Sequence, residues 1–370
     1  MGIFWGTLII AELFIRSQMP AKLSYIFLKK GGSVVYSILV LAALSGIVSA
    51  FVENVATVLI IAPIAFEIAK RLKISPIPYI ITIAISSNLQ GTATLVGDPP
   101  SMILASEMKM TFNDFFFYKG LPSLFFAVEL GAIVSLIVIY FIYRNKKEKI
   151  KEIKRQKIKS YFPTILLILM IVLLAMSNII PFQFEYYIGT VCTITGIIGL
   201  IWSKVKRDIN SFSFLKDSDW STFFFLMGVF VMVGIMQDIK LFDLLAYSIG
   251  NFVKGGILFA FILLIFISML VSAFVDNIPY FTAMVKVIKI MGLKFGLPIV
   301  PLMFGTVLGT TIGGNITPIG ASANIVGMGL LKKKGYKVNF WEFVKIGFIF
   351  TISALTISAL FVWIFFRNVR

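Results

Sequence analysis

The sequence has no histidine and only one cysteine, Cys192, among its 370 residues. The commonest metal ligand and the usual general base are therefore absent. A single cysteine also excludes a disulfide within the chain and a metal cluster held by several cysteines. We predict that the protein is not an enzyme and needs no resident cofactor.

Charged residues are scarce as well. They make up 14% of the chain, against about a quarter in soluble domains. Hydrophobic residues make up 59%, and the mean hydropathy is +0.96. Apolar runs long enough to cross a bilayer recur from end to end. This composition predicts an all-α polytopic membrane protein whose first partner is the lipid bilayer.

Acidic residues are half as frequent as basic ones, which gives a formal net charge of +17. The basic residues gather in short connections between apolar runs, most densely in "RNKKEKIKEIKRQKIK" at 144–159. Such placement is typical of the cytoplasmic loops that orient a membrane protein. We therefore exclude nucleic acid as a partner.

Several apolar runs are interrupted by residues that cannot continue a helix. Residues 34–69 contain Glu53 and Asn54 at the midpoint, 76–108 contain "GTATLVGDPP", and 295–331 contain "GGNITPIG". Irregular backbone at membrane depth is tolerated only where protein or a wet cavity covers it. Interrupted helices in corresponding halves are the best sequence indication of a transporter's binding site.

The two halves of the chain do correspond. "SAFVEN" at 49–54 matches "SAFVDN" at 272–277, and "GTATLVG" at 91–97 matches "GNITPIG" at 314–320. Both matches have an offset of 223 residues, which indicates a duplication. Each repeat is predicted to contain a helical hairpin (34–69 and 256–292) and a broken transmembrane helix (76–108 and 295–331).

With hairpins that return to the side they enter from, each repeat crosses the membrane an odd number of times and the next one is inverted. In that topology 25 of the 34 Lys and Arg residues fall on the cytoplasmic side, as expected for a protein of the cytoplasmic membrane. The predicted division of the chain is as follows: a first repeat at 1–143, a basic cytoplasmic loop at 144–159, two linking helices at 160–203, a cytoplasmic loop at 204–220, and a second, inverted repeat at 221–370.

This topology places Met1 outside the cell with no helix to carry it there. The second repeat opens with the polar "DSDW" at 217–220, whereas the first opens directly with "MGIFWG". We expect either a start further upstream or the loss of a peripheral first helix, and we favour the upstream start.

Glu53, Asp98 and Asp276 are the acids expected near the centre of the membrane. No Lys or Arg lies within the interrupted segments to neutralise them. An isolated carboxylate at that depth needs a proton, a cation or several hydrogen-bond donors. Because a carboxylate can hold either a proton or a metal cation, these residues predict coupling to H⁺ or Na⁺.

Hydroxyls, amides and freed carbonyls nearby could complete an oxygen cage for Na⁺. The full set of candidate ion- or substrate-binding residues is Glu53, Asn54, Asn88, Gly91, Thr92, Thr94, Asp98, Asp276, Asn277, Thr311, Asn315 and Thr317. Capping of helix N-termini is the competing interpretation for the acids and for Asn54 and Asn277. The glycines are expected to permit turns rather than to contact substrate. Glu12, Glu67 and Glu129 have no equivalent acid in the second repeat, and we interpret them as polar packing or interfacial residues.

The segments "SNLQGTATLVGDPPSMIL" and "SAFVDNIP" resemble those of the ion transporter superfamily. The branch they resemble contains arsenite-efflux permeases, NhaD-type sodium–proton antiporters and the P protein, with citrate and dicarboxylate carriers more distant. The resemblance covers residues 3 to about 350. It implies that hairpin tips and broken helices meet around the substrate and the coupling ion. The branch usually has Asp at both tips, so Glu53 is a departure that leaves the coupling ion in doubt.

The favoured function is a secondary transporter for a small inorganic solute or cation, by Na⁺/H⁺ antiport or arsenite/H⁺ efflux. A citrate, dicarboxylate or metal–citrate carrier is the alternative, although the acidic site would require accompanying cations. A passive channel does not explain the paired interruptions, and no Walker-type sequence supports an ATP-driven pump. An intramembrane aspartyl protease is remote, because Leu95 stands where its motif needs glycine. A homodimer is left open, and so is a separate ATPase subunit by analogy with arsenite permeases.

Overall fold

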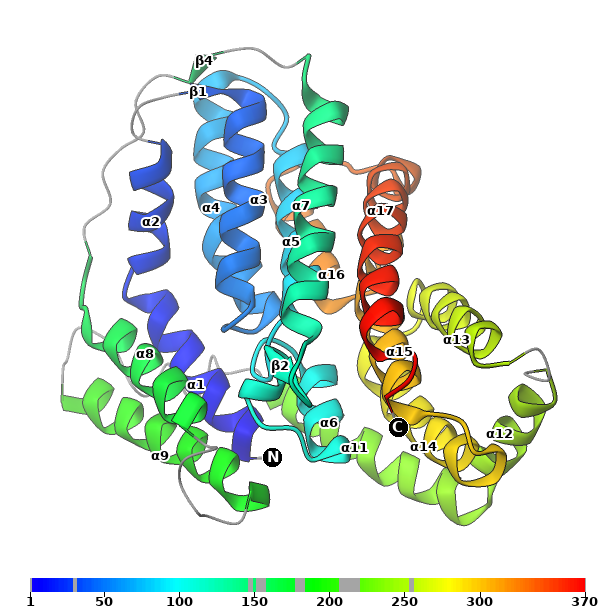
Figure 1. Ribbon diagram of the computed structural model, residues 1–370. Coiled ribbons are helices and arrows are strands. Elements are labelled where there is room, and N and C mark those ends of the chain that lie inside the picture. The colour runs from blue at the N-terminus through cyan, green and yellow to red at the C-terminus, as the bar shows by residue number, and fades with distance from the viewer. Residues whose placement is uncertain are drawn as a thin grey trace.

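The computed structural model of the protein is a bundle of helices with short two-residue strands between some of them (Figure 1). It describes residues 2–28, 32–145, 149–150, 158–176, 184–205, 220–252 and 256–369. Most of the predicted basic loop at 144–159 and of the predicted loop at 204–220 lies outside the described residues. The strands pair as β1 (Gly32–Ser33) with β4 (Lys149–Ile150) and β2 (Phe117–Tyr118) with β3 (Leu121–Pro122).

Two series of helices have matching lengths and order. The first repeat consists of α1 (Gly2–Arg16), α2 (Met19–Leu28), α3 (Val34–Ser49), α4 (Asn54–Leu72), α5 (Ile77–Gly91), α6 (Pro99–Met108) and α7 (Leu124–Tyr143). The second consists of α11 (Trp220–Asp238), α12 (Leu241–Phe252), α13 (Ile257–Ser272), α14 (Asn277–Phe295), α15 (Ile299–Gly313), α16 (Ser322–Lys333) and α17 (Phe340–Phe366). Between them lie α8 (Phe162–Ala175) and α9 (Phe184–Val205), which pack against α1.

The offset of 223 residues holds for the structure as well as for the sequence motifs. When 223 is added to the first and last residues of α3 and α4, the results are the first and last residues of α13 and α14. Both hairpins also end in the left-handed conformation, at Lys73 (φ 55°) and Gly296 (φ 67°). The predicted fold class is confirmed: the chain is all-α, with a helical hairpin and a broken helix in each repeat.

The two repeats are inverted relative to each other. In Figure 1, α7 runs upward toward β4, while its counterpart α17 runs downward beside it to the C-terminus. The two helices pack closely, because Gly131 of α7 faces Ala354 and Ser358 of α17 and the Ser358 hydroxyl donates to the Ala127 carbonyl at 2.8 Å. A Cβ at Gly131 would lie 2.5 Å from Ser358 Oγ, so the glycine permits this contact.

Each repeat begins with two helices separated by a left-handed residue. The apolar run at 221–247 divides into α11 and α12 at Lys240, which has φ 59°. In the first repeat, α2 begins after Gln18, which has φ 62°. The turn at Lys240 contains no glycine or proline, whereas Pro20, in the first turn of α2, is a residue that commonly marks the start of a helix.

Four helical stretches of the described chain are long and apolar enough to cross a membrane: Leu124–Tyr143, Tyr187–Val205, Ile299–Ile316 and Phe340–Phe366. Ile299–Ile316 differs from the others because almost all of it is buried within the protein. It comprises α15 and the 3-10 turn Gly314–Ile316, so an interrupted helix lies at the centre of the bundle, where protein covers its irregular end.

Candidate functional site

Both hairpins have an acid at the tip that caps the second helix. Glu53 Oε2 accepts from the Ala56 N–H, and Asp276 Oδ1 accepts from the Ile278 N–H, each at 3.0 Å. Their backbone angles are nearly the same, φ −50° and ψ 143° for Glu53 and φ −55° and ψ 141° for Asp276. The additional methylene of Glu53 lets it reach the third residue of its helix, while Asp276 reaches the second. Capping is therefore present at both acids, and a role in transport stays a prediction.

The asparagines beside these acids accept hydrogen bonds rather than cap. Ser49 Oγ donates to Asn54 Oδ1 at 2.6 Å, and Ser272 Oγ donates to Asn277 Oδ1 in the same way. Ser87 of the broken helix in turn donates to Ser49 Oγ at 2.9 Å. Ser272 Oγ likewise contacts the Thr310 carbonyl of α15 at 2.6 Å, so each hairpin tip is closed on itself and joined to the broken helix of its own repeat.

Glycines allow the broken helices to approach the tips. A Cβ at Gly91 would lie 2.4 Å from Asn54 Oδ1, and one at Gly314 would lie 3.0 Å from Asn277 Oδ1. Real side chains essentially never come as close as the first of these distances, so Gly91 is required by the contact.

Two of the predicted threonines donate hydrogen bonds to backbone carbonyls at the hairpin tips. Thr94 donates its hydroxyl to the Ala50 carbonyl, and Thr317 donates to the Ala273 carbonyl. Both threonines are buried. They satisfy carbonyls that the end of a hairpin helix leaves free, which is a structural role at membrane depth.

The two repeats meet through uncharged polar side chains at the ends of α5 and α15. Thr92 Oγ1 donates to Thr311 Oγ1 at 2.7 Å, and Asn88 Nδ2 donates to Asn315 Oδ1 at 2.9 Å. All four residues are at most 1% exposed. At an offset of 223, position 88 corresponds to 311 and position 92 to 315, so each contact is the symmetric counterpart of the other. The structure therefore brings these four predicted residues together.

Asp98 adjoins this junction. It caps α6 by accepting from the Ser101 N–H at 2.9 Å, and it also accepts from Thr92 Oγ1 at 3.4 Å. Asp98 is buried, and its counterpart in the second repeat is Ala321, which begins α16 without a side-chain cap. The carboxylate at this place belongs to the first repeat alone.

The three predicted acids lie at the N-termini of three different helices, α4, α6 and α14. Among the described residues, no group of three Asp, Glu, Cys or His side chains could hold a metal ion. Glu53 and Asp276 lie at separate hairpin tips and are partly buried, and Asp276 Oδ2 accepts from Ser322 Oγ at 3.3 Å.

Asn324 is a buried residue of this site that the sequence reasoning missed. Its Oδ1 accepts from Asn88 at 2.9 Å, and its Nδ2 donates to the carbonyls of Gly314 and Thr317, both at 2.9 Å. It corresponds to Ser101 at the offset of 223, so comparing the first turns of α6 and α16 could have revealed it.

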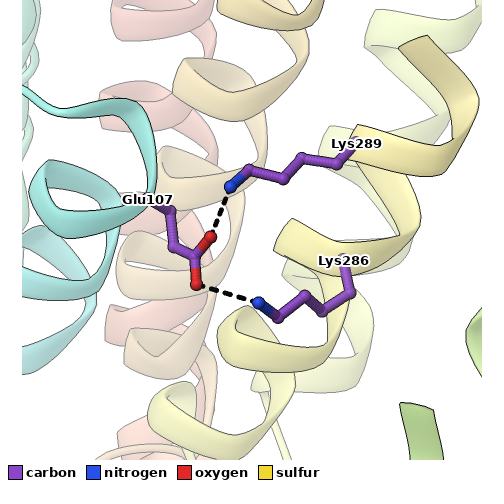
Figure 2. Close-up of polar contacts among 3 residues, drawn as sticks. All are labelled: Glu107, Lys286 and Lys289. Atoms are coloured by element: carbon purple, nitrogen blue, oxygen red, sulfur yellow. Dashed lines mark hydrogen bonds and ion pairs between the residues drawn. The ribbon is translucent and has the colours of Figure 1, made fainter. Parts of the chain in front are cut away.

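An ion-pair cluster joins the repeats away from this junction (Figure 2). Glu107 of α6 binds Lys286 at 3.0 Å and Lys289 at 2.5 Å, both from α14. All three side chains are partly exposed. The partners are 179 and 182 residues apart in sequence, and no local pattern predicted the contact.

Paired hairpins, broken helices and a buried polar junction between inverted repeats define a membrane transporter. The chain belongs to the citrate transporter family (CitMHS), whose model matches residues 1–296. This places it in the ion transporter superfamily and bears out the resemblance seen in the sequence motifs. The favoured branch, the favoured solute and the coupling ion are finer questions than this match answers.

Several proteins are similar in sequence to this chain over most of its length. A 46 kDa membrane protein of Mycobacterium leprae is 29% identical over 341 residues, covering 90% of this chain and 78% of that protein. An uncharacterized transporter of Synechocystis is 28% identical over 402 residues, covering 100% and 86%. The mouse P protein is 26% identical over 405 residues, covering 88% of this chain and 49% of its own.

The fold also resembles that of a solved transporter. The crystal structure of the Alcanivorax borkumensis YdaH transporter, described as having an unusual topology, aligns with a TM-score of 0.67 and 12% identity. The alignment covers 98% of this chain and 84% of that one. At this identity the likeness supports the fold alone.

Proposed function

We propose that the protein is a secondary active transporter of the cytoplasmic membrane that moves a small inorganic solute or cation in exchange for H⁺ or Na⁺. The observation that carries this proposal is the chemistry of the junction. The junction, the hairpin tips beside it and the starts of α6 and α16 are formed by residues 49–54, 86–101, 272–277 and 310–324. These segments contain three carboxylates and no Lys or Arg. A cation or a neutral solute fits such a site better than an anion does.

Asp98 and Asp276 can serve as exchange groups because each is held by hydrogen bonds and neither forms an ion pair with another described residue. Asp98 receives hydrogen bonds from one backbone N–H and one hydroxyl, and Asp276 has a similar pair of donors. Such bonds stabilise a carboxylate while leaving lone pairs for a proton or a sodium ion. Binding of one and release of the other would couple their movements.

Citrate, alone or with a metal, is a second candidate, and the family match favours it. A carboxylate substrate normally pairs with Arg or Lys. Because the junction has neither, citrate would have to enter with cations that neutralise it. Transport of citrate that requires Na⁺, H⁺ or Mg²⁺ would agree with this second candidate.

Inside-out membrane vesicles that contain the protein can separate these functions. Sodium–proton exchange is followed with a pH-sensitive dye, and uptake of arsenite and of citrate with and without Mg²⁺ is followed directly. Sodium exchange alone identifies an antiporter, arsenite uptake alone a permease, and cation-dependent citrate uptake the second candidate. If the vesicles transport none of these solutes, the proposal is contradicted.

Asp276→Asn tests the role of the tip carboxylate. Asparagine is as good a helix cap as aspartate but carries no charge, so the fold should persist while ion-coupled flux is lost. Asp243→Asn is the matched control, because Asp243 is an exposed acid of the same repeat paired with Lys294 at 2.6 Å. Flux at the wild-type rate in Asp276→Asn would rule out the exchange role of this carboxylate.

A further inference from the structure

A small polar cavity lies between α3, α5 and α7, apart from the junction described above. Its volume is about 20 Å³, and Ser86, Gln90 and Ser135 contribute polar atoms to a lining that is otherwise apolar. Ser86 Oγ and Gln90 Oε1 line it without a hydrogen-bond partner among the described residues, and both residues are only 5% exposed. A cavity needs roughly 10–15 Å³ and two to four polar partners to hold one water molecule, and this one qualifies.

Glu129 is the acid next to this cavity. Its Oε2 accepts a hydrogen bond from Gln90 Nε2 at 3.2 Å. The carboxylate is partly buried on α7, and the sequences of the adjacent α3 and α5 contain no charged residue. On α17 the charged residues Glu342 and Lys345 lie in the first turns, beside the opposite end of α7 at Tyr143. An acid within a membrane span that accepts a hydrogen bond from an amide but forms no ion pair with another described residue is a functional candidate by default.

We propose that Glu129 is a proton-binding site of the transporter and that Gln90, with one water molecule in the cavity, responds to its protonation. This inference rests on the proposed function and adds a coupling carboxylate outside the junction to those proposed there. It also replaces our interpretation of Glu129 as a packing residue.

The response follows from hydrogen-bond chemistry. When Glu129 is ionised it can only accept, so Gln90 turns its NH₂ group toward it and leaves Oε1 facing the cavity, where water or Ser86 can donate. When Glu129 binds a proton, its O–H becomes a donor and the Gln90 oxygen can turn to accept from it. The NH₂ group then faces the cavity and donates to the water or to Ser86 Oγ. The proton is the only species gained or lost.

Gln90 is placed to pass this change on. It directly precedes Gly91, which packs against Asn54 at the first hairpin tip. On the other side, a Cβ at Gly46 of α3 would lie 2.7 Å from Gln90 Cγ, so the hairpin leaves room for the glutamine only because residue 46 is glycine. The change in the hydrogen bonds of Gln90 therefore takes place where the hairpin and the end of α5 meet.

The second repeat has no equivalent site. The positions 223 residues after Gln90 and Glu129 are Gly313 and Ile352, which contain neither an amide nor an acid. The pair of Glu129 and Gln90 is therefore not among the features that the two repeats share.

Infrared difference spectroscopy tests proton binding directly, without depending on transport. The purified protein in liposomes is taken from alkaline to acid buffer, in H₂O and in D₂O. We expect a carboxylic-acid C=O band that Glu129→Gln removes and that Gln90→Leu shifts. Glu67→Gln is the matched control, because Glu67 is a partly exposed helical acid paired with Arg71 at 2.7 Å, and it should leave the band in place. A wild-type spectrum in Glu129→Gln would overturn the proposal.

Flux measurements then separate this inference from the proposed function. In liposomes under a sodium or citrate gradient, Glu129→Gln should lose the pH dependence of net flux but keep exchange of labelled solute for unlabelled solute. Asp276→Asn should lose net flux and keep the Glu129 infrared band. An unchanged pH profile in Glu129→Gln would count against the proton site, whereas absence of any flux in the wild-type protein would count against the proposed function only.

Discussion

The first and second repeats share the contacts that hold their backbone in place, but they differ in the acids they carry. In both, a serine bonds an asparagine at the hairpin tip and a threonine bonds the carbonyl that follows the hairpin's first helix. Beyond the tips, Asp98, Glu107 and Glu129 belong to the first repeat, and their counterparts are Ala321, Leu330 and Ile352. The shared contacts define the scaffold, whereas the unshared acids are where coupling and gating chemistry can differ between the two sides of the membrane.

The largest effect is expected at the shared glycines. A Cβ at Gly97 would lie 2.3 Å from the Gly91 carbonyl oxygen, and one at Gly320 would lie 2.6 Å from the Gly314 oxygen. Gly97→Ala and Gly320→Ala should each cost roughly 3 kcal/mol or prevent folding, because the clash is with backbone. Thermal unfolding followed by size-exclusion chromatography measures this. Gly329→Ala has open space and is the control. Unequal losses in the two glycine variants would break the equivalence of the repeats.

A smaller effect is expected at Asp98, the acid without a counterpart. Asp98→Ala gives the first repeat the residue of the second and should cost about 1 kcal/mol through the lost cap. Asp98→Asn keeps the cap, so its stability should be near that of the wild-type protein. Measured together, the melting temperature and flux of both variants separate the two roles. Loss of flux in Asp98→Asn assigns the charge to transport, and retained flux leaves Asp98 as a cap only.

The ion pairs between the repeats should contribute less. Glu107→Gln removes the partner of Lys286 and Lys289, and because these side chains are partly exposed the expected loss is at most about 1 kcal/mol. Salt should reduce the difference from wild type, since screening weakens the native pair. Melting temperatures at low and high salt check this, with Asp243→Asn as an ion-pair control within the second repeat. A large, salt-independent loss would contradict a surface ion pair.

The smallest effect is expected at Glu53. Glu53→Asp makes the first tip like the second, and the shorter side chain should cap the second helical residue as Asp276 does. Stability should change by no more than about 0.5 kcal/mol, because both residues supply a capping carboxylate. If flux nevertheless falls strongly, the added methylene of Glu53 positions its carboxylate for coupling, and the tips are not interchangeable.

The hairpins and broken helices could be predicted because the motifs that mark them occur once in each repeat. The tip acids, the glycines and the threonines each occur twice at one offset, so chance was easy to dismiss. The turn at Lys240 could not be predicted, since a left-handed residue without glycine has no clear sequence signature, whereas Pro20 was a missed signal for the start of α2. The Glu107 cluster was missed because its contacts join segments far apart in the chain.

The junction of α5 and α15 also preserves a trace of ancestry. A half-length ancestor that paired with an inverted copy of itself would have had one residue type at positions 88 and 311, and one at 92 and 315. Its two contacts would then have been identical. Today an amide meets an amide in one contact and a hydroxyl meets a hydroxyl in the other. A change of both residues of one contact together accounts for this difference, so a graft between relatives should exchange contacting partners rather than single residues.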